Sequence, residues 1–243
     1  MWSKFDAVYC LSLADYKRRR DDMRLELERV GLTDVHWKIT VKNTFYKYIW
    51  NHPDFHTLPW LKGLDWALNC TMGHYEIMKE ALAIGYKMVL VMEDDIRFLK
   101  DTKQMGDILA DLPEADIALF DKNMAGDKAP WFIAIGEDRV NDRYIDYSRV
   151  NFGSTGCVAY SEKAMRVITE RQEGMFMPAD FSTNRVDQSG NVINDDGLTR
   201  VASIKNLAVQ DLRYKDEMTE LDSYIYKDIA NLNEYNLELW LRK

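Results

Sequence analysis

The chain has 243 residues, enough for one large α/β domain or two small ones, and its 47% of hydrophobic residues can build a substantial core. Its formal net charge of −8 argues against non-specific nucleic-acid binding, which depends on basic patches. No apolar run reaches the ~20 residues of a membrane helix, and no secretory pattern opens the chain. The three cysteines are widely separated, which favours buried thiols in a reducing compartment over disulfides or zinc ligands, so we expect a cytoplasmic protein.

The N-terminal residues predict a strand, a helix and a second strand. Residues 5–13 form a mostly apolar run typical of a buried strand, and Asp15 is placed to cap the helix that follows. Gly31 ends that helix, and residues 34–41 alternate as a second strand would. A βαβ unit of this kind predicts a parallel sheet. The absence of a G-x-G-x-x-G or P-loop motif disfavours dinucleotide oxidoreductases and P-loop enzymes.

Two segments near this unit have both a structural and a functional interpretation. Residues 17–20 are Lys-Arg-Arg-Arg, which suits a solvated helix face, but cations are unfavourable in a helix's first turns, so one of them could bind an anion. Residues 44–66 hold seven aromatic residues among prolines and histidines. They predict either a small satellite core or an ordered loop that packs Trp50 and Trp60 against a sugar.

The stretch 70–98 has the clearest functional pattern. Apolar residues at steps of three and four predict a helix over residues 68–85, and residues 88–92 predict a strand buried on both faces. Glu93, Asp94 and Asp95 follow at its carboxyl end, where open α/β sheets bind ligands. If the strand continued, Glu93 and Asp95 would point the same way and could share one divalent cation. Asp95 is then expected to be an exposed acid with little packing.

The rest of the chain predicts further alternating elements. Helices are expected over residues 101–112 and 161–171. Strands are expected over residues 116–120, 131–135, 144–150 and 157–160, with one or two more over residues 198–210. Asp121 follows the first of these strands, and a loop of small residues ends at Gly156.

Carboxylates at a sheet edge suit substrates that carry phosphates. Mg²⁺ or Mn²⁺ is usually held by one or two carboxylates together with substrate phosphates, and it neutralises a departing diphosphate. That arrangement fits a glycosyltransferase that uses a nucleotide sugar. A phosphohydrolase also fits, but it normally needs more acids or histidines around its metals, and none of the four histidines here has metal-ligand spacing.

Several segments closely resemble motifs of glycosyltransferase family 25, which includes bacterial lipooligosaccharide galactosyltransferases and collagen galactosyltransferases. The resemblance is strongest in Cys-Thr-Met-Gly-His at 70–74 and Val-Met-Glu-Asp-Asp at 91–95. The other similar segments are residues 9–13 with 19–23, residues 156–161 and residues 178–180. The chain differs from the family pattern at Ser12, where an Asn is usual, and at Gly73, where a Ser is usual.

The resemblance implies a GT-A-type fold, a nucleotide-sugar donor that is commonly UDP-galactose, and transfer with inversion. It implies that Glu93 and Asp95 hold Mn²⁺ or Mg²⁺, and that Asp180 is the base that accepts the acceptor's proton, with Asp121 as the alternative. The positions that match the family's donor site are Leu11, Ser12, Arg19, His74, Glu93, Asp94 and Gly156.

We therefore expect residues 1–243 to form a single GT-A-like α/β domain with a mixed, mostly parallel central sheet flanked by helices. The expected activity is metal-dependent transfer of galactose from UDP-galactose to a glycan acceptor such as lipooligosaccharide, in lipopolysaccharide biosynthesis. Trp50 and Trp60 would bind the acceptor, and a glycolipid acceptor would bring the protein into peripheral contact with a membrane. The alternative is a catalytically silent module that binds a nucleotide sugar or a glycan.

Overall fold

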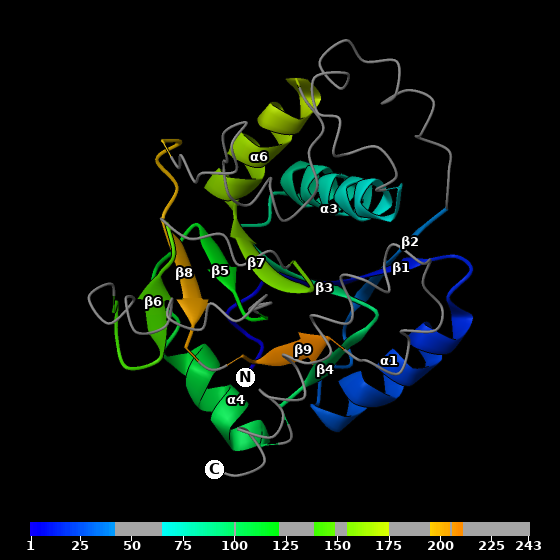
Figure 1. Ribbon diagram of the computed structural model, residues 1–243, viewed down its shortest axis with the longest axis horizontal. Coiled ribbons are helices and arrows are strands. Elements are labelled where there is room, and N and C mark those ends of the chain that lie inside the picture. Colours follow the sequence, from blue (N-terminus) through cyan, green and yellow to red (C-terminus); the bar gives the residue numbers. More distant parts are fainter. Residues whose placement is uncertain are drawn as a thin grey trace, which may run out of the picture.

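The computed structural model describes residues 1–41, 65–99, 101–121, 139–148, 155–174, 195–204 and 206–210. Its centre is a seven-stranded sheet with the strand order β2-β1-β3-β7-β5-β8-β6 (Figure 1). Strands β1, β2, β3, β5 and β8 run in one direction, and β6 and β7 run in the other. The predicted mixed, mostly parallel α/β sheet is therefore confirmed.

The predicted βαβ unit is present at the N-terminus. β1 (Ala7–Leu13) is followed by α1 (Lys17–Arg29) and by β2 (His36–Thr40), which pairs with β1 in parallel. Gly31 lies at φ 69° and ends α1, because its N–H and that of Leu32 bond back to the last helical carbonyls.

The predicted cap of α1 by Asp15 is wrong. The N-cap residue is Tyr16, and no side chain caps it, because the helix begins one residue later than the sequence suggests. The Arg20 guanidinium instead donates to the carbonyls of Leu13 and Ala14, which ties the loop to the first turn of the helix.

The predicted helix and central strand around residue 85 are also confirmed. α3 (Asp65–Ile84) leads through Gly85, at φ 93°, into β3 (Met88–Glu93). β3 pairs in parallel with β1 and antiparallel with β7 (Cys157–Ser161). Strands on both sides and helices on both faces leave the middle of β3, Val89 to Met92, fully buried.

The second half of the chain completes the sheet. Its helices are α4 (Thr102–Ala110) and α6 (Glu162–Gly174), and its remaining sheet strands are β5 (Ile117–Leu119), β6 (Tyr144–Asp146) and β8 (Arg200–Ser203). A separate two-stranded sheet pairs β4 (Ile96–Phe98) with β9 (Ala208–Gln210). β6 is shorter than the predicted strand 144–150 and pairs with β8; the predicted strand 131–135 lies outside the described residues.

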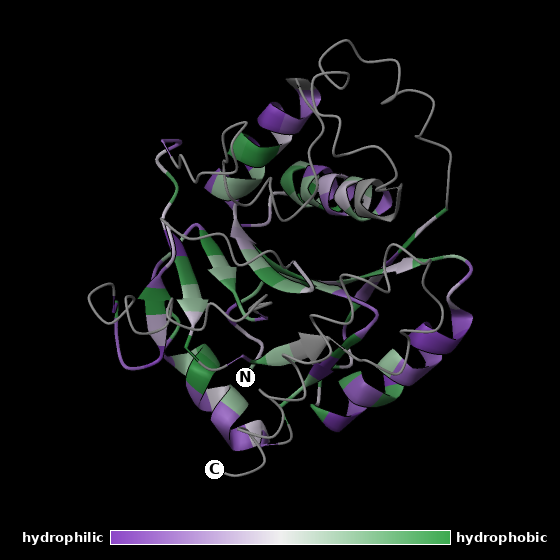
Figure 2. Cartoon of the chain, viewed as in Figure 1, coloured by the Kyte–Doolittle hydropathy of each residue, from purple (hydrophilic) through white to green (hydrophobic). Residues whose placement is uncertain are grey.

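The sheet separates two hydrophobic cores. α3 and α6 cover one face, and α1 and α4 cover the other together with the β4–β9 pair (Figure 1). Along β3, Val89 and Val91 face the first core while Leu90 and Met92 face the second, as strand alternation requires. The helices turn their apolar sides to the sheet and their polar sides outward (Figure 2). No helix in the described residues is long and apolar enough to cross a membrane.

Candidate active site at one edge of the sheet

The strand directions bring several sequence-predicted residues to one edge of the sheet. The parallel strands β1, β3 and β5 end there, with Ser12, Glu93 and Asp121 at or just beyond their carboxyl ends. β7 runs the opposite way, so Thr155 and Gly156, which precede it, lie at the same edge. This is the edge at which α/β sheets bind ligands.

The acidic segment divides between the two faces of the sheet. β3 ends at Glu93, and Asp94 and Asp95 form a turn before β4, so the strand does not continue through the acids. Glu93 keeps the alternation of Val89 and Val91 and faces α3, whereas Asp94 and Asp95 face α1 through contacts with Ser12 and Arg19.

On the α1 side, a buried arginine meets both aspartates. Nη1 of Arg19 lies 3.2 Å from Oδ2 of Asp95 and 3.7 Å from Oδ1 of Asp94. Ser12 Oγ donates to Oδ2 of Asp94 at 2.5 Å. The Arg20 guanidinium in turn donates to Ser12 Oγ at 3.1 Å. The Arg19 guanidinium also lies over the Tyr16 ring, 4.2 Å from its centroid. The first turn of α1 thus supplies an internal countercharge for the acids.

Asp95 is not the exposed acid that the sequence suggests. Asp95 and Arg19 are each 4% exposed, because α1 packs across the end of β3 and covers the turn. Burial, followed by the charge of Asp95, raises the pKa of Asp94 to about 7, although the Ser12 hydrogen bond and the Arg19 charge act the other way. The two adjacent aspartates therefore share less than two full negative charges near neutral pH.

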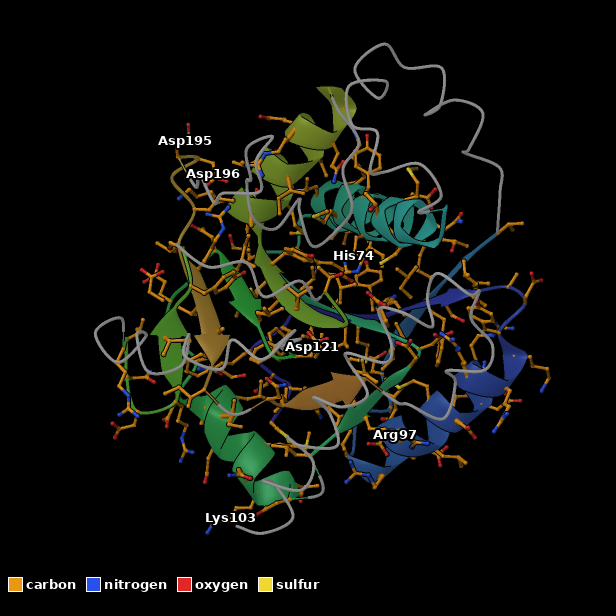
Figure 3. The ribbon with its side chains drawn as sticks, viewed as in Figure 1. His74, Arg97, Lys103, Asp121, Asp195 and Asp196 are labelled. Atoms are coloured by element: carbon orange, nitrogen blue, oxygen red, sulfur yellow. The ribbon has the colours of Figure 1, made fainter. Side chains whose placement is uncertain are left out.

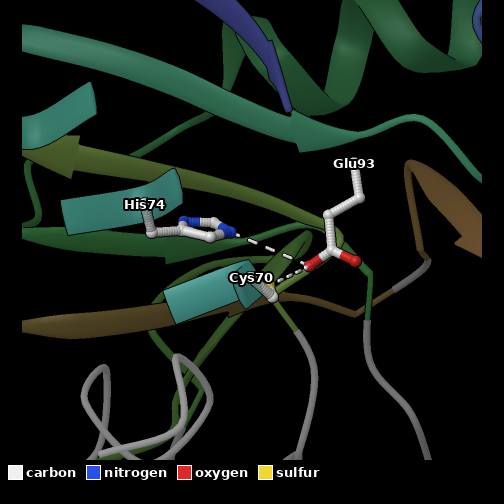
Figure 4. A group of neighbouring side chains, drawn as sticks. All are labelled: Cys70, His74 and Glu93. Atoms are coloured by element: carbon white, nitrogen blue, oxygen red, sulfur yellow. Dashed lines mark hydrogen bonds and ion pairs between the residues drawn. The ribbon is translucent and has the colours of Figure 1, made fainter. Parts of the chain in front are cut away.

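On the α3 side, Glu93 meets a cysteine and a histidine. Cys70 Sγ donates to Oε1 of Glu93 at 3.2 Å, Thr155 Oγ1 donates to the same oxygen at 3.3 Å, and His74 Nε2 lies 3.7 Å from it (Figure 4). Burial raises the pKa of Glu93, but the His74 ring and these hydrogen bonds outweigh it and hold that pKa below its usual value. Glu93 is therefore ionised at neutral pH.

Two glycines allow close approaches at this edge. A Cβ atom on Gly73 would lie 2.2 Å from Cδ1 of Leu11, so the glycine lets α3 sit directly on β1. A Cβ atom on Gly156 would lie 2.4 Å from Oδ2 of Asp121, and the Gly156 carbonyl accepts from the N–H of Glu93 at 2.8 Å. Asp121 is thereby held against the loop that enters β7. His74 and Asp121 both lie in the centre of the molecule (Figure 3).

The structure thus groups most of the sequence-predicted site residues in two neighbouring clusters. Ser12, Arg19, Asp94 and Asp95 form one, and His74 and Glu93 belong to the other, with Leu11 packed beneath α3. The predicted base Asp180 and the predicted acceptor residues Trp50 and Trp60 lie outside the described residues.

Sequence reasoning missed three residues of the Glu93 cluster: Cys70, Thr155 and Tyr160. A cysteine and a histidine four residues apart in a predicted helix were the available signal, because that spacing puts both side chains on one face. The sequence-based expectation that neither the cysteines nor the histidines are metal ligands treated each residue type by its own spacing and did not combine them. Cys70, His74 and Glu93 together could hold a metal ion, since their donor atoms all lie within 4.8 Å of one another.

The donor atoms at this edge divide by chemical type. The oxygens of Asp94 and Asp95 match the preference of Mg²⁺ and Mn²⁺, although Arg19 already lies against both carboxylates. Around Glu93, sulfur and nitrogen donors replace oxygen. Hard and borderline-soft cations would therefore favour different sides of the same strand end.

Comparison with known proteins gives no family assignment. No protein-family model matches the chain, and no curated protein matches it. Among solved structures, the inositol-1-phosphate CTP transferase from T. maritima is similar at a TM-score of 0.44 and 10% identity, over 94% of this chain and 96% of that one.

Two further solved structures are similar at lower TM-scores. A glycosyltransferase involved in the glycosylation of the major capsid of PBCV-1 has a TM-score of 0.35 and 10% identity, over 68% of this chain and 66% of that one. A197 from STIV has a TM-score of 0.36 and 10% identity, over 81% of this chain and 80% of that one. At these scores the likenesses define neither activity nor substrate.

Proposed function

We propose that this protein transfers a sugar from a nucleotide-sugar donor to a glycan acceptor. The observation that carries the proposal is the buried Arg19–Asp94–Asp95 cluster at the carboxyl ends of β1 and β3, beside Glu93 and Asp121. A site that combines a guanidinium with carboxylates at this edge can bind a diphosphate directly and through a cation. The motif resemblance to glycosyltransferase family 25 falls on the same residues.

The donor would lie across the first turn of α1. The Arg19 guanidinium is suited to a two-pronged contact with phosphate. Ser12 and Asp94, which lie next to Arg19, would hydrogen-bond hydroxyl groups of the nucleotide or the sugar. Leu11, His74 and Gly156 would complete the donor site, and UDP-galactose is the donor that the resemblance favours. Mn²⁺ or Mg²⁺ held by Asp95 would neutralise the diphosphate that leaves. Glu93, which the sequence pattern predicts to share this cation, faces α3 on the other side of the sheet from Asp95, so it is not one of the ligands of this cation.

Sugar transfer with inversion also needs a base for the acceptor hydroxyl. A carboxylate must take that proton as the oxygen attacks the anomeric carbon. Asp180 is our choice, and Asp121, buried beside Gly156 at the same edge, is the alternative. Trp50 and Trp60 would hold a glycan acceptor such as lipooligosaccharide, which would bring the protein to a membrane surface and into lipopolysaccharide biosynthesis in the cytoplasm.

The test is a screen of nucleotide sugars for hydrolysis and transfer, each measured with Mn²⁺, with Mg²⁺ and with EDTA. We expect one donor to be consumed in the presence of a cation and Asp95→Asn to lose that activity. The control is Asp142→Asn, which changes a fully exposed acid beside β6, the strand at the other end of the sheet from β1 and β3. Saturable donor binding by calorimetry without turnover would support the silent binding module, and no donor binding at all would end the proposal.

A further inference from the structure

We propose that Cys70, His74 and Glu93 form a binding site for a borderline-soft divalent cation, with Zn²⁺ as the ion that the donor set fits best. The site lies between α3 and the carboxyl end of β3 (Figure 4). Arg19 contacts Asp95 on the opposite face of the sheet. The site is separate from the cation of the proposed sugar transfer and does not depend on that function.

The backbone prearranges the three ligands. Cys70 and His74 are one helical turn apart on α3, so both side chains leave the helix on the same face. Glu93 is the last residue of β3 and, by strand alternation, points to the face that α3 covers. Two rigid elements therefore deliver the ligands, which is how metal sites attain a fixed geometry.

The distances between donor atoms suit a tetrahedral ion. Zinc bonds of about 2.0–2.3 Å at tetrahedral angles separate neighbouring ligand atoms by about 3.3–3.8 Å. Oε1 of Glu93 lies 3.2 Å from Cys70 Sγ and 3.7 Å from His74 Nε2. All three donor atoms fall within 4.8 Å of one another, so only a small movement would close the set around one ion.

The His74 ring provides an independent sign of a ligand. His74 is 1% exposed, yet its Nε2 has no hydrogen-bond partner in the described part of the chain and points at Oε1 of Glu93. A buried ring nitrogen without a partner is costly unless something else satisfies it. On the other side of the ring, Tyr160 Oη lies 3.3 Å from Nδ1. A metal-binding histidine commonly uses its second nitrogen in this way to fix its orientation.

The donor set also selects the ion. A thiolate, an imidazole and a carboxylate suit Zn²⁺ and its spectroscopic substitute Co²⁺, whereas Mg²⁺ prefers oxygen ligands in an octahedral arrangement. Three protein ligands leave a fourth position open. The Glu93 side chain is 26% exposed and Cys70 is partly exposed, so an ion could reach the site from solvent.

Without an ion, Cys70 would keep its thiol proton and donate it to Glu93. Binding of the ion would displace that proton to the buffer. Proton release, sulfur coordination and stoichiometry therefore separate the two states, and none of them requires sugar-transfer activity.

The experiment uses the full chain treated with EDTA and then freed of chelator, without any donor. Titration with CoCl₂ should produce a thiolate-to-cobalt charge-transfer absorption that saturates at one ion per chain, and ZnCl₂ should abolish it. Calorimetry in two buffers of different ionisation enthalpy should detect protons released on Zn²⁺ binding. An excess of MgCl₂ should not displace the cobalt.

Matched variants locate the site. Cys70→Ser should remove the charge-transfer absorption, and His74→Gln should weaken Zn²⁺ binding at least as strongly. Tyr160→Phe, which keeps all three ligands and the ring, should weaken it about 10–100-fold. His36→Gln, at an exposed histidine of β2, should leave Zn²⁺ affinity unchanged. Thermal melting of each variant checks that it is folded.

The proposal is overturned if no cobalt absorption saturates at one ion per chain, or if Zn²⁺ binding survives in the Cys70→Ser, His74→Gln double variant. An equal loss of affinity in His36→Gln would also overturn it, because that result means binding by surface histidines. Each of these results leaves the sugar-transfer proposal untouched, since the screen for donor turnover is a separate measurement on the same protein.

Discussion

Glu93 and Asp94 are consecutive in the sequence, yet they belong to different chemical environments. Strand alternation sends Glu93 to Cys70 and His74, and sends Asp94 to Ser12 and Arg19. The first carboxyl has its pKa lowered and the second has its pKa raised. Opposite shifts in neighbouring acids are a common property of sites that bind cations or move protons.

The raised pKa of Asp94 predicts a stability change with pH. Its folded pKa is about 7 against 3.8 for the free group, so the folded state holds a proton that the unfolded state releases. The Asp94 contribution to stability is therefore full below pH ~4 and is lost as pH rises towards 7, by up to about 1.4 kcal/mol per pKa unit of difference. Asp94→Asn, which mimics the protonated acid, should stabilise the protein at pH 8 and change little at pH 4.5.

Urea unfolding at the two pH values, in buffer with EDTA, measures this difference. Asp142→Asn, at a fully exposed side chain, serves as the control, and its free energy of unfolding should follow that of the wild type at both pH values. If Asp94→Asn destabilised the protein equally at both pH values, the shift would be absent and the Ser12 hydrogen bond would dominate instead.

Arg19 and Arg18 offer a matched pair for the donor site. Arg19 is buried against two carboxylates, while the neighbouring Arg18 is exposed. A lysine keeps the charge but lacks the planar fork that binds phosphate with two hydrogen bonds. Arg19→Lys should therefore raise the donor KM about tenfold or more, and Arg18→Lys should not. Steady-state kinetics with the donor found in the screen compares the two variants. Equal increases in the donor KM would mean that residues 17–20 act only through their positive charge and not through a specific phosphate contact by Arg19.

At the scale of elements, the position of α3 on the sheet depends on a residue with no side chain. Gly73 lies within α3, where glycine ordinarily costs helix stability relative to alanine. Here a larger residue would meet Leu11 of β1. The close packing brings Cys70 and His74 up to Glu93.

Gly73→Ala and Gly106→Ala should have opposite effects on stability. Gly106 is also inside a helix, α4, but a Cβ atom there would meet nothing within 4 Å, so alanine should stabilise the protein by about 0.5–1 kcal/mol. At Gly73 the contact with Leu11 should outweigh that gain and destabilise by about 1–3 kcal/mol. Chemical denaturation of both variants decides. Adding Leu11→Ala should relieve the Gly73→Ala loss, and no relief would mean that another contact is responsible.

The sequence predicts features that depend on neighbouring residues better than features that depend on contacts between residues far apart in the chain. β1, α1 and β3 were predictable because burial and helix periodicity are local properties of the chain. The Arg19–Asp95 pair was not, because α1 and β3 lie far apart in sequence and only their packing buries both residues. The same holds for Cys70 and Glu93, and for β6, whose partner β8 is distant in sequence.

At the scale of the whole molecule, a second buried ionic cluster lies away from the candidate active site. Asp196 accepts from Arg200 of β8 at 2.6 Å and from Arg171 of α6 at 2.5 Å, and Arg200 is fully buried. Asp195 and Asp196 lie at the margin of the molecule, beside β8 (Figure 3). The cluster joins α6 to the first residue of β8.

Asp196→Asn should destabilise the protein by about 3–5 kcal/mol at pH 7, because it removes the carboxylate partner of a buried guanidinium. Burial raises the pKa of Asp196, but the Arg200 and Arg171 hydrogen bonds outweigh it and lower that pKa. The contribution of the Asp196 carboxylate to stability is therefore fully present above the unfolded pKa near 4 and is lost progressively as pH falls towards the lower folded pKa. The difference in stability between the variant and the wild type should therefore narrow in acid. Urea unfolding from pH 7 to pH 3 measures the convergence, and a constant difference would contradict it.

The placement of β7 has a consequence for the order in which the chain folds. β1, β2 and β3 come first in the chain and pair with one another, but β3 meets its other neighbour only after β7 has been synthesised, and β5 pairs with β8 later still. Since local contacts form before distant ones, the N-terminal strands with α1 and α3 should collapse first. The Arg19–Asp95 pair and the Cys70–His74–Glu93 cluster would then exist, at least in outline, before β5 and β8 complete the sheet around them.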